Sequence, residues 1–99
     1  MTSLSLGLVG LGRMGSNMAR RLARGGVRVV GCDATPGAAS ALGQEGVIVA
    51  ADSVAALVAA LPASRVVWTM VPAGAATQAT IDALAAALAP GDTIVDGGN

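Results

Sequence analysis

The sequence predicts an α/β domain built in three layers, with helices on both faces of a parallel sheet. Apolar segments typical of buried strands alternate with helical segments along the chain of 99 residues. Hydrophobic residues make up 54% of the chain and charged residues only 12%, as expected where both faces of a sheet are covered. A glycine-rich turn joins the first strand to the first helix. We therefore expect one domain with right-handed crossovers and the strand order 3-2-1-4-5.

The first strand is predicted over residues 4–9, and three glycines follow it in the spacing G-x-G-x-x-G. Gly10 permits a tight turn, Gly12 lets a pyrophosphate approach the backbone, and Gly15 lets the next helix pack closely on the strand. The helix, expected from residue 14 to about residue 24, directs free N–H groups and its positive dipole end at the phosphates. This pattern predicts a Rossmann-like dinucleotide site that includes the other loop residues, Leu11, Arg13 and Met14.

The second strand is predicted over residues 27–32, and Asp33 follows it directly. An acidic residue at this position accepts hydrogen bonds from the hydroxyls of the adenosine ribose. A strand, a glycine loop, a helix and a strand-end acid together specify a dinucleotide far better than the glycine spacing alone. Asp33 is therefore a predicted cofactor-binding residue.

Two shorter helices and a short strand are expected next. Thr35 is the predicted N-cap of the first helix, with Pro36 at its first position and an end near residue 44. Residues 47–49 are predicted as the third strand. Ser53 is the predicted N-cap of a helix that runs to Leu61.

The last two strands are predicted over residues 65–71 and 93–96, with a helix from Thr77 between them. In a parallel sheet the carboxyl ends of the strands share one edge, and ligands bind there where the strand order reverses. We therefore expect three segments to gather at this edge: residues 10–15, 71–74 and 97–99.

Composition excludes several other functions. The formal net charge is zero, so the chain has no electrostatic footprint for nucleic acid or an anionic membrane. No signal peptide and no apolar run of about 20 residues is found, and one cysteine cannot form an internal disulfide. We expect a cytoplasmic protein. The chain has no His and no Tyr, its acids form no acid–base pair, and no metal site is predicted.

Residues 10–18, 68–74 and 94–99 resemble the decarboxylating 6-phosphogluconate dehydrogenases of the β-hydroxyacid dehydrogenase superfamily. The glycine loop is common to the superfamily, whereas Met-Val-Pro-Ala-Gly at residues 70–74 is more particular. Asp-Gly-Gly-Asn at residues 96–99 discriminates best, because 3-hydroxyisobutyrate-type enzymes usually carry a serine- and threonine-rich stretch there. The resemblance covers the whole chain but only the first part of a family member.

The resemblance implies further site residues. Val71, Pro72 and Ala73 would line the cofactor, and Asn99 would reach both the nicotinamide side and a sugar-phosphate substrate. The complete enzyme would oxidise and decarboxylate 6-phosphogluconate to ribulose 5-phosphate and CO2. The family's catalytic groups lie further along a full-length member. We therefore expect a truncated dinucleotide-binding domain over residues 1–99, with the helical catalytic domain absent, no catalytic residue and no activity alone.

One departure from the family bears on the choice of cofactor. Many members follow the second strand with an Asn-Arg pair that binds the 2′-phosphate of NADP, whereas this chain has Asp33 and no later arginine until Arg65. A carboxylate repels a 2′-phosphate, so we expect NAD rather than NADP. Arg13 in the glycine loop is the side chain able to compensate.

Other functions remain open at this stage. The chain could be the NAD-binding domain of another β-hydroxyacid dehydrogenase, or a non-catalytic nucleotide-binding module. A methyltransferase also has a glycine-rich first loop, but Gly15 at the sixth position favours a dinucleotide. The fifth strand would leave an unpaired edge, so we expect a homo-oligomer or self-association.

Overall fold

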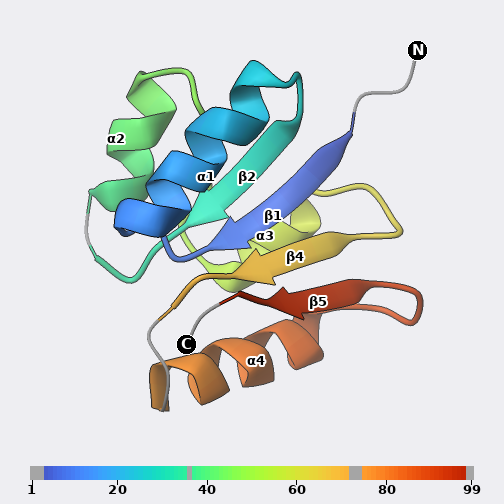
Figure 1. The fold of residues 1–99 in the computed structure, drawn as a ribbon. Helices are drawn as coiled ribbons and strands as arrows, with labels where there is room; N and C mark the ends of the chain where they lie inside the picture. The colour runs from blue at the N-terminus through green and yellow to red at the C-terminus, as the bar shows by residue number, and fades with distance from the viewer. Residues whose placement is uncertain (1–3, 36, 72–74, 98–99) are drawn as a thin grey trace.

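The computed structural model describes residues 4–35, 37–71 and 75–97, and it contains a five-stranded parallel sheet (Figure 1). The strand order β3-β2-β1-β4-β5 is the predicted one. The strands are β1 (Ser5–Val9), β2 (Arg28–Cys32), β3 (Val49–Ala50), β4 (Val66–Thr69) and β5 (Thr93–Asp96).

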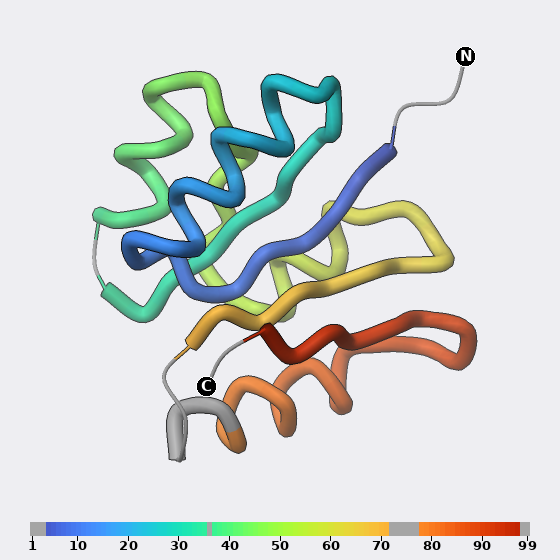
Figure 2. Tube along the Cα trace, viewed as in Figure 1, coloured from blue at the N-terminus to red at the C-terminus, as the bar shows by residue number. Residues whose placement is uncertain are grey.

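Helices on both faces of the sheet complete the three predicted layers. They are α1 (Arg13–Arg24), α2 (Ala38–Gln44), α3 (Val54–Ala59) and α4 (Ala75–Ala87). In Figures 1 and 2, α1 and α2 lie in front of the β1–β3 half of the sheet, and α3 lies behind it. Helices α1 and α2 cover one face and α3 and α4 the other, as right-handed crossovers require when the strand order reverses after β3.

Each face of the sheet has its own hydrophobic core. Leu8 and Val29 point to the α1 and α2 side, where they join Leu42. The neighbouring strand residues point to the opposite side and pack with α3 and α4, in a cluster that includes Val9, Val30, Val67, Leu57 and Leu84. Alternate residues of one strand thus serve different cores, which is why the strands read as continuous apolar runs.

The start of α2 differs from the prediction. Thr35 is not the N-cap, because the cap is Gly37 and the helix begins at Ala38. The Thr35 N–H instead donates to the Asp33 carboxylate at 2.8 Å, which holds Thr35 in the loop. Gly37 then turns the chain into the helix with φ of 85°, a left-handed conformation that suits glycine. Pro36 lies outside the described residues.

The third strand is also shorter and later than predicted. Its residues are Val49 and Ala50, whereas Val47 is still hydrogen-bonded to the end of α2. The Val47 N–H donates to the Leu42 carbonyl at 3.1 Å, and Gly46 has φ of 80°. This pairing is typical of a Schellman helix end, and it delays the strand by two residues.

The other elements follow the prediction closely. Ser53 caps α3, since its hydroxyl accepts the Ala56 N–H at 3.0 Å. The fourth strand is shorter than predicted, and α4 begins two residues before Thr77. Within the described part of the chain, no helix has the length and apolar character needed to cross a membrane.

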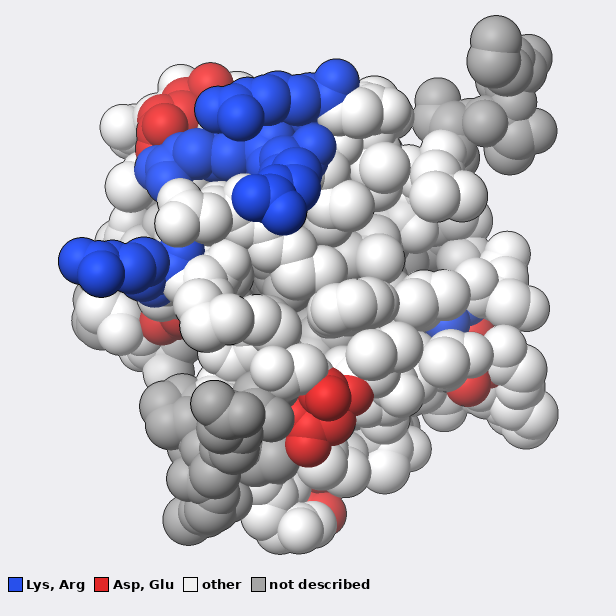
Figure 3. Space-filling model, in the orientation of Figure 1, with Lys and Arg blue, Asp and Glu red and all other residues white. Residues whose placement is uncertain are grey.

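Charge is unevenly distributed over the face shown in Figure 3, where basic side chains gather over α1. Arg21 and Arg24 lie in the last turn of that helix, where positive charge interacts favourably with the helix dipole. Arg20 pairs with Glu45 at 3.1 Å across to the end of α2. Both side chains are well exposed, so the pair adds little stability.

Candidate cofactor-binding site

The loop after β1 is held between the ends of β2 and β4. The Gly10 N–H donates to the Cys32 carbonyl at 2.9 Å, and the Met70 N–H donates to the Val9 carbonyl at 2.7 Å. The Gly97 N–H donates to the Thr69 carbonyl at 2.9 Å, which brings the end of β5 to the same edge. The three predicted segments therefore converge as far as they are described.

Two of the three loop glycines are required by the chain itself. Gly10 has φ of 101°, and a Cβ there would lie 2.7 Å from the Met70 carbonyl oxygen. A Cβ on Gly15 would overlap the Gly10 carbonyl oxygen, so α1 can approach β1 only because Gly15 has no side chain. These glycines close the turn and seat the helix, as predicted.

Gly12 is different, because the described chain does not require glycine there. Its φ of −70° suits any residue, and a Cβ on Gly12 would have no protein atom within 4 Å. The space in front of its Cα is therefore open. A glycine in this position leaves room for a ligand to reach the backbone, which fits a pyrophosphate at the loop.

The N-terminus of α1 is open to an anion. Gly12 is the N-cap residue and provides no side chain to cap the helix, and no acidic residue lies in the first turn. Arg13 is exposed, and Met14 is 69% exposed. The first N–H groups of the helix, its dipole and an adjacent guanidinium together suit a phosphate.

Leu11 has a structural part in the loop. Its side chain is 6% exposed and packs in the core between the sheet and α1. The Ser16 hydroxyl donates to the Leu11 carbonyl at 2.7 Å, and the Leu11 N–H donates to the Asp33 carboxylate at 2.5 Å. The loop is therefore braced from both the helix and the end of β2.

Asp33 fixes the geometry at the end of β2. Its Oδ2 accepts the Leu11 N–H and its Oδ1 accepts the Thr35 N–H. Partial burial by itself would raise the pKa of Asp33, but these hydrogen bonds outweigh it and hold the pKa below its ordinary value. Asp33 is thus a carboxylate at neutral pH, with lone pairs left to accept further donors.

Cys32 packs in the hydrophobic core on the α3 side of the sheet. It is buried, and burial together with the neighbouring Asp33 charge raises the pKa of its thiol to about 11. A protonated, buried thiol is unreactive.

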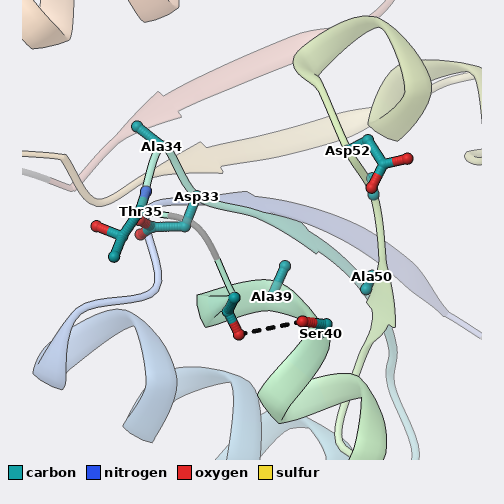
Figure 4. A pocket seen from close by; sticks show the side chains of 9 residues that line it. Asp33, Ala34, Thr35, Ala39, Ser40, Ala50 and Asp52 are labelled. Carbon is teal, nitrogen blue, oxygen red and sulfur yellow. Dashed lines mark hydrogen bonds between the residues drawn. The ribbon is translucent and has the colours of Figure 1, made fainter.

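A hollow of about 260 Å³ opens beside Asp33, at the carboxyl ends of β2 and β3 (Figure 4). Asp33, Ala34 and Thr35 form one wall, and Asp52 lies across the hollow from them, after β3. No lysine, arginine or histidine contributes to the described lining. The remaining lining residues are Gly37, Ala39, Ser40, Ala50 and Ala51.

The other predicted site residues are only partly described. Val71 is half-buried and packs against the core on the α3 side. Pro72, Ala73 and Asn99 lie outside the described residues. Asp96, which precedes the last segment, accepts a hydrogen bond from the buried Thr69 hydroxyl at 3.2 Å.

Sequence reasoning missed two features of this site. It assigned Asp33 to a ribose but not to the Leu11 N–H, because a contact between two loops leaves no local pattern. It also passed over Asp52. The rule that selected Asp33, an acid directly after a strand, does not select Asp52, because Ala51 separates Asp52 from the end of β3.

Comparison with known proteins agrees with this geometry. Residues 5–99 match the family described as the NAD binding domain of 6-phosphogluconate dehydrogenase. An NAD(+)-dependent, decarboxylating 6-phosphogluconate dehydrogenase of Haloferax volcanii is 44% identical over 96 residues, which cover 97% of this chain and 32% of that protein. A chloroplastic 6-phosphogluconate dehydrogenase of Oryza sativa is 41% identical, over 95% of this chain and 20% of that protein.

Solved structures show the same fold. The Plasmodium falciparum 6-phosphogluconate dehydrogenase superposes with a TM-score of 0.86 at 25% identity, over 95% of this chain and 21% of that one. A Mycobacterium tuberculosis 3-hydroxyisobutyrate dehydrogenase gives a TM-score of 0.84 at 30% identity, over 98% of this chain and 32% of that one. The chain thus spans about a third or less of these relatives. It belongs to the family of NAD binding domains of 6-phosphogluconate dehydrogenase.

Proposed function

We propose that this chain binds NAD and forms the nucleotide-binding part of a decarboxylating 6-phosphogluconate dehydrogenase. The observation that carries the proposal is the open space at Gly12 in front of an uncapped helix N-terminus. The pyrophosphate would bind there, against the first N–H groups of α1, with Arg13 and Met14 beside it. Gly10 and Gly15 would act by shaping the loop.

The adenosine ribose would bind at Asp33. The Leu11 and Thr35 N–H groups hold this carboxylate in one orientation and keep it ionised. A fixed carboxylate accepts the hydroxyls of a ribose and repels a 2′-phosphate. Because no cation lies in the described lining of the hollow, the proposal specifies NAD over NADP. The similarity to the NAD(+)-dependent enzyme of Haloferax volcanii supports this choice.

A calorimetric titration of the chain with NAD and with NADP tests the cofactor. We expect NAD to bind at least about tenfold more tightly, a difference of about 1.4 kcal/mol. Asp33→Asn should reduce the preference for NAD over NADP, because it weakens the binding of NAD and removes the charge that repels the 2′-phosphate. Equal binding of the two dinucleotides by the wild-type chain would contradict the proposed preference and point to Arg13 as a 2′-phosphate ligand.

In the whole enzyme, Val71, Pro72 and Ala73 would line the cofactor, and Asn99 would lie between the nicotinamide side and the sugar phosphate. When bound, NAD supplies the hydride acceptor. Oxidation of 6-phosphogluconate at C3 gives a 3-keto acid, whose loss of CO2 gives ribulose 5-phosphate. We expect this reaction in the cytoplasm, and we expect the 99-residue chain alone not to catalyse it, because it has no acid–base pair.

The substrate is tested on the full-length protein that contains this chain. We expect NAD reduction and CO2 release with 6-phosphogluconate, and neither with 3-hydroxyisobutyrate. The second substrate is the informative control, because the Mycobacterium tuberculosis enzyme named for it has the same fold at 30% identity. Activity with 3-hydroxyisobutyrate alone would move the chain to that branch of the superfamily.

A further inference from the structure

Asp52 is a carboxylate to which the proposed function gives no role. It lies two residues after the end of β3, is exposed, and lies across the hollow from Asp33 (Figure 4). Among the described residues, Asp52 forms neither a hydrogen bond nor an ion pair. A carboxylate that lines a hollow and has no protein partner is available to a ligand.

The backbone on both sides of Asp52 is held in place. The Ala51 N–H donates to the Gly31 carbonyl at 2.8 Å, which fastens the end of β3 to β2. On the other side, Ser53 is the N-cap of α3 and accepts the Ala56 N–H at 3.0 Å. The backbone at Asp52 is therefore held before any ligand arrives, so only its side chain has to be ordered on binding.

The order of the strands tells which part of a dinucleotide would reach Asp52. This step rests on the proposed function. With the pyrophosphate at the end of β1 and the ribose at the end of β2, the base continues in the same direction to the end of β3. Neighbouring strands lie about 4.8 Å apart, so one step across the sheet matches the step from a ribose to its base.

The chemistry of adenine fits a carboxylate at that end. The exocyclic amine of adenine is a hydrogen-bond donor, and a carboxylate only accepts. Under the proposed function, the lone pairs that Asp33 keeps beside the Leu11 and Thr35 N–H groups serve the ribose hydroxyls. The Ser40 hydroxyl donates to the Gly37 carbonyl at 3.2 Å. Asp52 is the charged acceptor left in the described lining.

We propose that Asp52 recognises the adenine base of the dinucleotide by accepting a hydrogen bond from its exocyclic amine. Asp52 is thus the base-selecting residue of the hollow, and Asp33 is the ribose-selecting one. Asp33 and Asp52 contact different parts of the ligand, so the two contacts can be tested separately. Replacing the amine by a carbonyl would set oxygen lone pairs against the Asp52 carboxylate, while leaving the ribose and pyrophosphate unchanged.

The test compares NAD with nicotinamide hypoxanthine dinucleotide, which carries a carbonyl in place of the amine. Calorimetric titration of the wild-type chain should give at least about tenfold weaker binding of the hypoxanthine dinucleotide, since hydrogen bonds to charged groups are the strong ones. Asp52→Asn should reduce that ratio below about threefold, because the amide can donate to the carbonyl. Asp82→Asn removes the same charge from exposed α4 and should leave the ratio unchanged.

The outcomes distinguish a failure of the Asp52 assignment from a failure of the proposed function. Equal binding of the two dinucleotides by the wild-type chain would overturn the assignment of Asp52 and leave NAD binding intact. A preference for NAD that survives Asp52→Asn would also overturn it. If neither dinucleotide binds, the proposed function fails first and the assignment of Asp52 fails with it. Circular dichroism of Asp52→Asn checks that the fold is retained.

Discussion

The three glycines of the loop show how one spacing combines two different physical demands. Gly10 and Gly15 are required by the folded chain, through a positive φ at Gly10 and the contact of α1 with the Gly10 carbonyl. Gly12 has an ordinary φ and open space where its Cβ would be. Stability and binding should therefore respond to different substitutions within the same six residues.

Gly15→Ala tests the structural demand. The added Cβ would overlap the Gly10 carbonyl oxygen, so α1 must move away from β1. We expect the free energy of unfolding to fall by about 1–3 kcal/mol, as for other overpacked sites. Chemical denaturation measures this free energy of unfolding. Gly26→Ala cannot serve as a control, because Gly26 has φ of 85° and an alanine would be strained there. An unchanged stability of Gly15→Ala would contradict the close packing described.

The hydrogen bonds of Asp92, at the opposite end of the sheet, predict that the stability of the fold depends on pH. Hydrogen bonds from the Ala89 N–H at 2.8 Å, the Arg65 N–H at 2.6 Å and the Arg65 guanidinium at 3.3 Å lower its pKa. The folded chain then binds fewer protons than the unfolded one. The stability from Asp92 is thus fully present above pH about 4 and is lost as the pH falls through the folded-state pKa.

Asp92→Asn should therefore be less stable than the wild-type chain at pH 7, and the difference should shrink below pH about 4. Urea denaturation at pH 7, 5, 4 and 3 measures it. Asp33 also has a lowered pKa, but it is present in both chains and cancels in the difference. A constant difference across this range would show that the Asp92 charge does not stabilise the fold.

At the scale of the elements, the sequence predicts best what depends on neighbouring residues. The apolar runs of β1, β2 and β5, the glycine turn into α1 and the Ser53 cap all follow from local pattern. The starts of α2 and β3 do not. Thr35 is held by the Asp33 carboxylate, and Val47 is still bonded to the Leu42 carbonyl. These short-range hydrogen bonds compete with the helix cap and the strand that the residue types favour, and they shift both boundaries.

The same distinction holds for the site. Gly10, Gly12, Gly15 and Asp33 can be found from spacing, because each occupies a fixed place relative to a strand end. The bond from Leu11 to Asp33 joins residues that only the pairing of β1 with β2 brings together. Asp52 lies at the site because β3 pairs with β2. A strand of only two residues is too short to be recognised from its sequence pattern.

Ser53→Ala tests the helix cap on α3. Loss of the hydroxyl leaves the Ala56 N–H without its acceptor, and we expect the free energy of unfolding to fall by about 1 kcal/mol. Ser53→Asn should retain most of the stability, because an asparagine oxygen also caps helices. Equal losses in both variants, measured by urea denaturation, would show that the hydrogen bond is not what stabilises α3.

At the scale of the whole molecule, the two edges of the sheet are β3 and β5 among the described strands (Figure 1). Unpaired edge strands offer free N–H and C=O groups to another chain. Val49 on β3 is 43% exposed, and Val95 on β5 is half-buried in the row that includes Trp68. We expect the chain to self-associate through the longer edge, β5.

Light scattering over a range of concentrations measures this association. Val95→Lys should shift the chain toward the monomer, because lysine on an edge opposes pairing, whereas Val49→Lys makes the same change on β3 and should not. A wild-type chain that is monomeric at all concentrations would contradict the expectation.

The central claim, that the Gly12 space holds the cofactor pyrophosphate, is tested most directly by titrating wild-type and Gly12→Ser chains with NAD while measuring their Tm. Serine is a good N-cap residue, so the Tm of Gly12→Ser should be unchanged or higher. Its side chain would enter the space at the loop, and NAD binding should weaken at least about tenfold. Undiminished NAD binding by a stably folded Gly12→Ser chain would contradict the claim.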